Sequence, residues 1–222
     1  NGVRFTKAYC AQPLCTPSRT AIFSGKMPYE TGFIGNAPEK DDQWPDSLLM
    51  MGKIFQQGGY QTGYVGKWHL PVPTTKISQH GFGYIENTNF LDYNDGATPS
   101  FCARFIKDNA KKPFLLVASF LNPHDICEWA RDEHLKMDVL QDAPPPDQCP
   151  ALPANWQIPA NEPKIIRDQQ KQVGLRTYPS VNYTPEKWRQ YRWAYNRLVE
   201  KVDQYVEQVL YSLKKYGVEK NT

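Results

Sequence analysis

The sequence predicts an α/β fold, with a mainly parallel sheet flanked by helices, on three observations. Segments with a helical spacing of apolar residues alternate with short apolar runs of strand length. These runs pass directly into polar stretches, as strands of a parallel sheet do at their carboxyl ends. Hydrophobic residues make up 40% of the 222 residues, which is ample for one globular core.

The first predicted element is a short helix within LCTPSRTAIFSG, residues 14–25. Thr16 suits the N-cap, and Pro17 suits the first helical position, where its missing N–H costs nothing. Gly25 can end the helix. We expect its buried side to consist of Ala21, Ile22 and Phe23.

This geometry would place Cys15 just before a helix N-terminus, where unpaired N–H groups and the helix dipole favour an anion. Arg19, about one turn into the helix, adds a forked cation that suits a tetrahedral oxyanion. The stretch therefore predicts an anion-processing site. A buried structural cysteine before an ordinary capped helix is the alternative, since free cysteines are among the most buried residues.

A second helix and a strand follow. The segment PDSLLMMGKIFQQGGY offers Asp46 as an N-cap, apolar residues at helical spacing and a glycine pair at 58–59 as a stop. Residues 60–65 are then predicted to form a strand that runs into Lys67 and His69. A strand-end lysine that is merely solvated and a histidine with a structural role are the alternatives for these two residues.

A third helix is predicted from Thr98, and it leads to PFLLVASF at 113–120, the clearest buried strand of the chain. That strand runs into Asn122-Pro123-His124-Asp125. Because ligands of open α/β sheets bind beyond the carboxyl ends of the strands, we expect the polar residues after both strands to lie at one edge.

Residues 143–163 contain seven prolines, so they can form neither a helix nor a central strand. We interpret this stretch as an extended surface excursion, and both a domain linker and a wall of a substrate cleft stay open. Thr184-Pro185-Glu186 then opens the longest helix, which ends before Gly217 and carries one apolar stripe. A coiled coil is the alternative for this helix.

Composition excludes several classes of protein. The net charge is +3, from 26 basic and 23 acidic residues, so no bulk charge favours nucleic acid or an acidic membrane surface. No apolar run approaches the roughly 20 residues that a membrane helix requires. The five cysteines include no CxxC pair, which disfavours a zinc ribbon and permits at most two disulfides and a free thiol.

Three motifs in order resemble those of the type I sulfatases. Cys15-Thr16-Pro17-Ser18-Arg19, followed by Ser24-Gly25, resembles the C-x-P-S-R signature. Gly66-Lys67-Trp68-His69-Leu70 resembles the second signature, with Pro71 in place of its last glycine, and Asn122-Pro123-His124 resembles a later P-H element. The long helix from Trp188 matches the helix that follows in these enzymes, so the resemblance covers nearly the whole chain.

The resemblance implies an alkaline-phosphatase-like α/β fold, present here only in part. Residues 1–222 would be the central portion of the N-terminal catalytic domain, with 143–163 as an excursion within it. It also implies that Cys15 is oxidised to formylglycine by the formylglycine-generating enzyme. The resemblance makes Cys15, Arg19, Lys67, His69 and His124 catalytic, and Lys67 and His124 contacts of the substrate. Asp125 would orient His124 or meet a substrate hydroxyl.

Family members hold a divalent cation, usually calcium, and hard oxygen ligands suit that ion. Here only Cys15, as formylglycine, matches a metal ligand, since the carboxylate motifs of the family lie outside this chain. Asp41-Asp42 sits in a polar loop and is expected to be a solvated turn. His80 and His134 are expected to lie outside the site.

The resemblance therefore implies an enzyme that hydrolyses a sulfate ester on a carbohydrate, with the chain alone inactive. The alternatives are a phosphonate or phosphate monoester hydrolase of the same superfamily, or a non-catalytic remnant that binds sulfated glycans. A secreted, periplasmic or lysosomal location is a family expectation, with any signal expected upstream of residue 1. No nucleic acid and no membrane span are expected.

Overall fold

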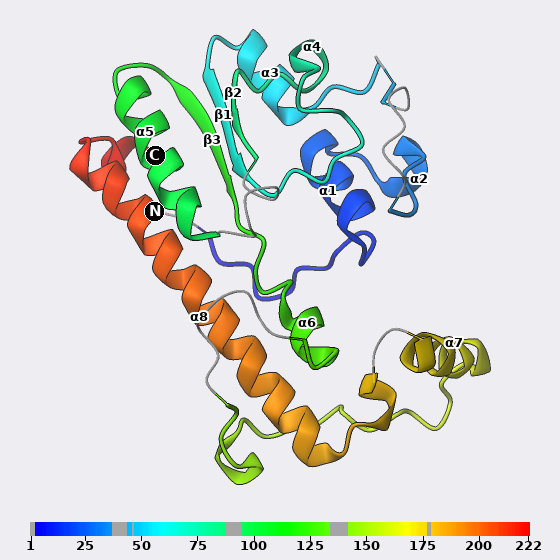
Figure 1. The fold of residues 1–222 in the computed structure, drawn as a ribbon. Coiled ribbons are helices and arrows are strands. Elements are labelled where there is room, and N and C mark those ends of the chain that lie inside the picture. Colours follow the sequence, from blue (N-terminus) through cyan, green and yellow to red (C-terminus); the bar gives the residue numbers. More distant parts are fainter. Residues whose placement is uncertain (1–2, 37–43, 46, 88–94, 134–141, 177–178) are drawn as a thin grey trace. The chain divides into compact units, whose positions relative to one another are not determined.

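The computed structural model describes residues 3–36, 44–45, 47–87, 95–133, 142–176 and 179–222. The chain divides into two compact units (Figure 1). Unit 1 comprises residues 1–120 and 206–222, and unit 2 comprises residues 121–205. Asp41-Asp42, Asp46 and His134, which the sequence analysis singled out, lie outside the described residues.

Unit 1 contains a parallel sheet of three strands in the order β2-β1-β3, so the predicted α/β class and parallel sheet are confirmed. The strands are β1 (Gln61–Gly66), β2 (Tyr84–Glu86) and β3 (Phe114–Ser119). Strand β1 pairs with β3 along its whole length, from Gln61 opposite Phe114 to Gly66 opposite Ser119. The two strands that the sequence predicts are therefore neighbours, and their carboxyl ends lie side by side.

Successive residues of β1 face opposite sides of the sheet, and a helix covers each side (Figure 1). Tyr64 packs against Phe23 of helix α1 (Cys15–Ser24), with ring centroids 5.8 Å apart. On the other side Gly63 lies against the ring of Phe105 in helix α5 (Thr98–Asn109), leaving no room for a side chain. A main core of aromatic and aliphatic side chains fills the α1 side.

Helix α1 begins earlier than predicted. It starts at Cys15 with Leu14 as N-cap, and no side chain caps it from within the helix. The backbone N–H of Thr16 instead donates to Asn36 Oδ1, at 3.0 Å. Thr16 is therefore not the N-cap, because it lies inside the first turn, and a side chain 20 residues away satisfies its own N–H.

The buried side of α1 also differs from the prediction. It consists of Thr16, Pro17, Thr20 and Phe23, whereas Ile22 is 64% exposed. Phe23 packs against Tyr64 of β1, so the residues that share its face of the helix, Thr20 one turn before it and Thr16 two turns before it, are buried as well. Gly25 ends the helix in the left-handed conformation, as expected (φ 68°).

The second helix, α3 (Met51–Gln57), is shorter at its N-terminus than the predicted element. Short elements that the sequence analysis did not anticipate are α2 (Pro28–Thr31), α4 (Ile77–His80) and strand β2. They are too short to carry a periodic apolar pattern, so sequence spacing does not reveal them. Helix α5 begins at Thr98 as predicted, and strand β3 lies within one residue of the predicted 113–120 at each end.

Unit 2 contains α6 (Ile126–Ala130), α7 (Lys164–Arg176) and the first two thirds of α8 (Pro185–Lys215), whose last residues belong to unit 1. Short 3₁₀ turns lie at Pro146–Gln148 and Pro179–Asn182. A small core joins α6 to α8 through Ile126, Ala194 and Leu198. The long predicted helix is thus confirmed, while α7 was not predicted.

In the proline-rich stretch 143–163 the regular structure is the 3₁₀ turn at Pro146–Gln148. Arg189 of α8 holds it by donating to the carbonyl groups of Asp147 (3.1 Å) and Cys149 (2.6 Å). All five cysteines are free thiols, with Cys102 and Cys149 buried. None of the described helices combines the length and the hydrophobicity that crossing a membrane needs.

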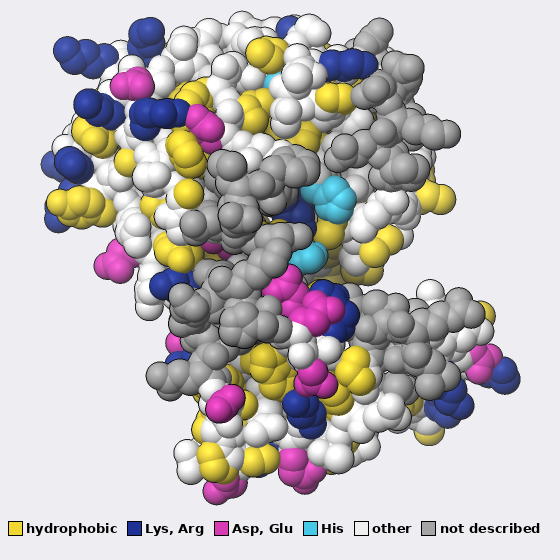
Figure 2. Space-filling view, viewed as in Figure 1, with side chains coloured by type: hydrophobic (Ala, Val, Ile, Leu, Met, Phe, Trp, Pro, Cys, Tyr) yellow, Lys and Arg dark blue, Asp and Glu magenta, His cyan; other side chains and the backbone are white. Residues whose placement is uncertain are grey.

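Charges of both signs lie on the face shown in Figure 2. Basic side chains gather over the part of unit 1 that carries α5, with acidic side chains among them, and unit 2 shows both signs interspersed. This mixture agrees with a net charge of only +3.

Candidate active site

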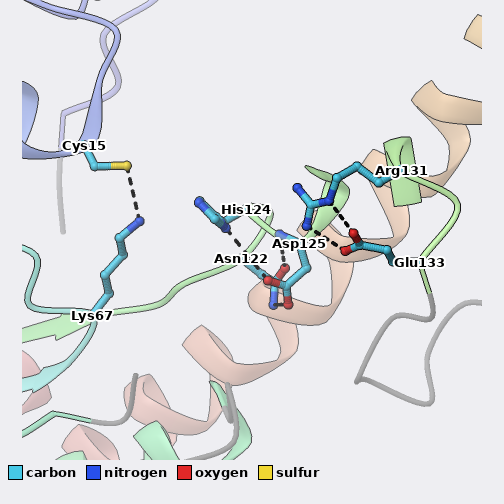
Figure 3. Close-up of polar contacts among 7 residues, drawn as sticks. All are labelled: Cys15, Lys67, Asn122, His124, Asp125, Arg131 and Glu133. Atoms are coloured by element: carbon cyan, nitrogen blue, oxygen red, sulfur yellow. Dashed lines mark hydrogen bonds and ion pairs between the residues drawn. The ribbon is translucent and has the colours of Figure 1, made fainter. Parts of the chain in front are cut away.

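The cysteine of the first motif lies beside the lysine of the second. Lys67 Nζ is 3.5 Å from Cys15 Sγ, and Figure 3 shows the lysine side chain reaching toward the thiol. Cys15 occupies the first turn of α1, where backbone N–H groups and the helix dipole favour negative charge. Lys67 is 9% exposed, so its ammonium group acts in a partly desolvated setting. The pair therefore places a cationic group and a helix N-terminus together, a combination that favours an anion.

The turn after β1 brings Lys67 to this position. Gly66 has a φ of 106°, and a Cβ at this residue would lie 2.0 Å from the carbonyl oxygen of Ser119. The close approach lets the backbone N–H of Lys67 donate to that oxygen, at 2.8 Å. A glycine is therefore required at 66, because it alone permits both the conformation and the contact.

Arg19 ties helix α1 to this turn. Its Nε donates to the carbonyl of Trp68 at 2.8 Å. Its Nη2 donates to the carbonyl of Lys67 at 2.7 Å and to Ser119 Oγ at 3.1 Å, and it also contacts the hydroxyl of Tyr64. These bonds involve Nε and Nη2 and join α1 to the ends of both β1 and β3. Arg19 thus has a clear structural part in the site, and the predicted contact with an oxyanion stays a prediction.

His69 lies in the same turn, two residues after Lys67, with a positive φ of 41°. A positive φ is uncommon for a residue with a side chain, and such residues concentrate at functional sites. His69 is half-buried. Unit 1 therefore brings four of the predicted residues to one edge of the sheet, namely Cys15, Arg19, Lys67 and His69.

The polar residues that follow β3 form a second group, within unit 2. Asn122 Nδ2 donates to Asp125 Oδ2 at 2.9 Å, and the backbone N–H of Asp125 donates to Asn122 Oδ1 at 3.2 Å. Asp125 Oδ1 lies 4.0 Å from His124 Nδ1, as Figure 3 shows. The Asp125 side chain is 4% exposed and that of His124 is 49% exposed. The two groups attract each other when the imidazole is protonated, and the orienting role of Asp125 stays a prediction.

The cluster around Cys15 belongs to unit 1, and the group of Asn122, His124 and Asp125 belongs to unit 2. That His124 and Asp125 meet Cys15 stays a prediction from the motifs. Arg131 and Glu133, also in unit 2, form a bidentate ion pair with two bonds of 2.7 Å (Figure 3).

His80 lies in unit 1 and has a structural role. It is fully buried, with Nε2 3.0 Å from the carbonyl of Thr74 and Nδ1 accepting from the backbone N–H of Phe82 at 3.0 Å. Burial lowers the pKa of its imidazole, the Thr74 carbonyl opposing this in part. The two bonds require the neutral ring protonated on Nε2.

The described residues do not by themselves fit a calcium ion. Across the described ranges no three His, Cys, Asp or Glu side chains come together as a metal site would require. Cys15, as formylglycine, would be a single oxygen ligand, whereas calcium takes six to eight.

Sequence reasoning missed two residues that shape the site. Tyr64, within β1, and Ser119, at the end of β3, both bond to Arg19. In the sequence they are ordinary strand residues. The available signal was the register itself, since two parallel strands that end in polar stretches place their last residues next to each other.

The fold and this cluster define a class: an α/β protein with a cysteine and basic side chains together at the carboxyl edge of a parallel sheet. The family model described as Sulfatase matches residues 1–222. The chain belongs to the sulfatase family.

Individual relatives and a solved structure are consistent with this family assignment. The chain is 28% identical over its full length to a delta 4,5-hexuronate-2-O-sulfatase of Bacteroides thetaiotaomicron, of which it covers 47%. It is 32% identical, over 55% of its length, to an ulvan-active sulfatase of Formosa agariphila, of which it covers 28%. A sulfatase-family crystal structure from Bacteroides thetaiotaomicron superposes on all of the chain with a TM-score of 0.77 at 25% identity, and 49% of it is covered. The chain thus spans half or less of the length of these proteins, and the structural neighbours confirm the fold.

Proposed function

We propose that the protein containing this chain hydrolyses a sulfate ester on a carbohydrate, through a formylglycine formed from Cys15. The observation that carries the proposal is the 3.5 Å approach of Lys67 Nζ to Cys15 Sγ at the start of α1. The thiol stands where the hydrated aldehyde would stand. A sulfate group there would meet a helix N-terminus and an ammonium group, both of which favour an anion.

The nucleophile is a hydroxyl of the hydrated aldehyde at position 15, whose proton passes to solvent as its oxygen attacks sulfur. The bond from sulfur to the sugar oxygen breaks, and the electron pair leaves with that oxygen. His124 donates a proton to the departing alkoxide, and Lys67 neutralises charge on the sulfuryl oxygens.

The second hydroxyl of the diol releases the product. His69 removes its proton, the aldehyde carbonyl re-forms, and the carbon–oxygen bond to sulfate breaks with its electron pair on sulfate. Water then adds to the aldehyde to restore the diol. A serine or a thiol lacks the second hydroxyl, which is why the modification matters. The division of roles between His69 and His124 belongs to the proposal.

Two observations support a carbohydrate as the substrate. The names of the two relatives above specify a hexuronate and ulvan, both carbohydrate targets. Half-exposed His124 beside buried Asp125 also offers hydrogen-bonding groups that suit sugar hydroxyls. The proposal includes the formylglycine-generating enzyme as a partner, and a secreted, periplasmic or lysosomal location.

The test uses the full-length protein, co-expressed with the formylglycine-generating enzyme, and compares an aryl sulfate with an aryl phosphonate monoester. Turnover of the sulfate that is lost in Cys15→Ala supports the proposal. A preference for the phosphonate would replace it with the phosphonate hydrolase alternative. Binding of sulfated glycans without turnover of either substrate, by fully modified protein, would show a binding remnant.

A further inference from the structure

The hydroxyl of Tyr64 lies beneath the turn that carries Lys67. Tyr64 is fully buried in β1, and its ring packs against Trp68 and Phe82, with centroids 4.8 and 5.3 Å away, as well as against α1. The aromatic contacts fix the ring, so the position of its hydroxyl is also fixed. This hydroxyl donates a hydrogen bond to the carbonyl of Lys67 and accepts one from Arg19.

The backbone of Lys67 is held on both sides of its Cα. Its N–H donates to the carbonyl of Ser119, at 2.8 Å. Its carbonyl accepts from the Tyr64 hydroxyl and from Arg19 Nη2. Ser119 Oγ in turn accepts from Arg19 at 3.1 Å, so one network of side chains surrounds the turn.

The hydroxyl of Tyr64 can act as this donor at neutral pH. Burial raises the pKa of the phenol, although the guanidinium of Arg19 opposes the shift. The group therefore keeps its proton, and the proton points to the Lys67 carbonyl.

Lysine has a flexible four-carbon stem, so the position of its ammonium group depends on how firmly its backbone is held. A group that stabilises charge must be held within about 0.5 Å of its productive position. We propose that Tyr64 is a positioning residue for Lys67, acting through the Lys67 carbonyl and Arg19. The inference rests on the proposed role of Lys67 as the cation that meets the sulfuryl oxygens.

Tyr64→Phe tests the inference, because it keeps the ring and removes only the hydroxyl. Tyr84→Phe is the matched control: the Tyr84 hydroxyl accepts from Arg104 at 2.9 Å, in the same kind of tyrosine–arginine bond away from this turn. Both variants are made in the full-length protein. Circular dichroism and thermal unfolding report whether each folds, and Ser119→Ala is a second variant in the same network.

The first measurement does not depend on turnover. With Cys15 left as a thiol, calorimetry measures the binding of inorganic sulfate. We expect Tyr64→Phe to weaken sulfate binding about fivefold, as the loss of one buried hydrogen bond would, and Tyr84→Phe to leave it unchanged. In a Lys67→Ala background, Tyr64→Phe should have no further effect, since the tyrosine acts through the lysine.

The second measurement is kcat for an aryl sulfate with the formylglycine form of the protein. Tyr64→Phe should lower kcat by at least the same factor of about five that is expected for sulfate binding. The inference would be overturned if the wild type and Tyr64→Phe bind sulfate equally, or if Tyr84→Phe loses as much sulfate affinity as Tyr64→Phe. It would also be overturned if Tyr64→Phe lowers the sulfate affinity further in the Lys67→Ala background, or if none of these proteins binds sulfate. Sulfate binding that depends on Tyr64, in a protein that turns over no sulfate ester, would instead refute the proposed function and leave this inference standing.

Discussion

Lys67 Nζ lies 3.5 Å from Cys15 Sγ, although 52 positions separate the two residues in the sequence. Helix α1 supplies the thiol and the turn after β1 supplies the ammonium group, and Arg19 binds the two elements together. The relationship makes the first two motifs one site.

Cys15 should be the single cysteine that the formylglycine-generating enzyme converts. It begins the only Cys-x-Pro-Ser-Arg sequence of the chain. Solvent exposure alone would favour a different cysteine for conversion, because Cys10 is exposed and Cys15 is only partly exposed. Peptide mass analysis of the co-expressed full-length protein should show the loss of sulfur at residue 15. Conversion at Cys10 or Cys127 would contradict the assignment, and Cys15→Ala should abolish turnover while leaving the fold intact.

His124→Ala should slow the hydrolysis of a sulfate ester with a basic leaving oxygen more than that of one with an acidic leaving group. If His124 protonates the leaving oxygen, a sugar sulfate needs that proton far more than an aryl sulfate with an acidic phenol. We expect a loss of about 100-fold or more in kcat for a sugar sulfate, the scale of general acid catalysis, and a much smaller loss for 4-nitrophenyl sulfate.

His69→Ala is the matched variant for this prediction. If His69 serves the release of sulfate, its loss should affect both substrates alike. Equal losses in His124→Ala for both substrates would remove His124 from the leaving-group role. A structure of the full-length protein with His124 on the opposite edge from Cys15 would do the same.

Gly66→Ala should destabilise the protein severely. The added Cβ would stand 2.0 Å from the Ser119 carbonyl oxygen, at a φ of 106° that side chains rarely adopt. The backbone at residue 66 or at Ser119 would have to move to relieve this contact. We therefore expect a loss of about 4 kcal/mol or more in the free energy of unfolding, which few single substitutions cause. Gly25→Ala is the control, because it shares a positive φ of 68° but meets no atom within 4 Å. Its cost should stay near 1 kcal/mol. Similar losses in urea unfolding for both would show that the contact with Ser119 is unimportant.

Stability should fall as the pH drops below the ordinary pKa of histidine because of His80. Burial lowers its pKa in the folded state below the ordinary 6.5, so the unfolded chain binds the proton more readily. The contribution of neutral His80 is complete above pH 6.5 and is lost as the pH falls toward the folded-state pKa. Protonation of Nδ1 would also break the bond from the Phe82 N–H.

His80→Gln lacks this titration. Its free energy of unfolding should therefore decline less than that of the wild type between pH 7 and 5, roughly the window of histidine titration. Parallel declines for the two proteins would assign the acid sensitivity to other groups.

Residues 1–222 alone should neither bind calcium tightly nor catalyse. Calcium needs six to eight oxygen ligands, and the described residues bring no three acidic, histidine or cysteine side chains together for a metal. Calcium titration by calorimetry and an aryl sulfate assay on the purified fragment test this, with the full-length protein as the control. Micromolar calcium binding together with turnover by the fragment would show that the metal ligands have been misplaced.

The sequence by itself determined the class of fold, the long elements and the identity of the motif residues. Apolar runs such as 113–120 are local signals, and the periodic stripe of the last helix is another, so both survive folding unchanged. The motifs at Cys15 and Lys67 were equally visible, because they depend on neighbours in the chain.

Tertiary structure decided the rest, because those outcomes depend on contacts between residues far apart in the chain. Asn36 took the capping role that Thr16 was expected to play, and the packing of Phe23 left Ile22 exposed. The parallel register of β1 and β3 placed Ser119 against Gly66 and so created the network of Arg19 and Tyr64. Hydrogen bonds of this kind have no sequence spacing, since each is satisfied by whichever partner the fold brings within reach.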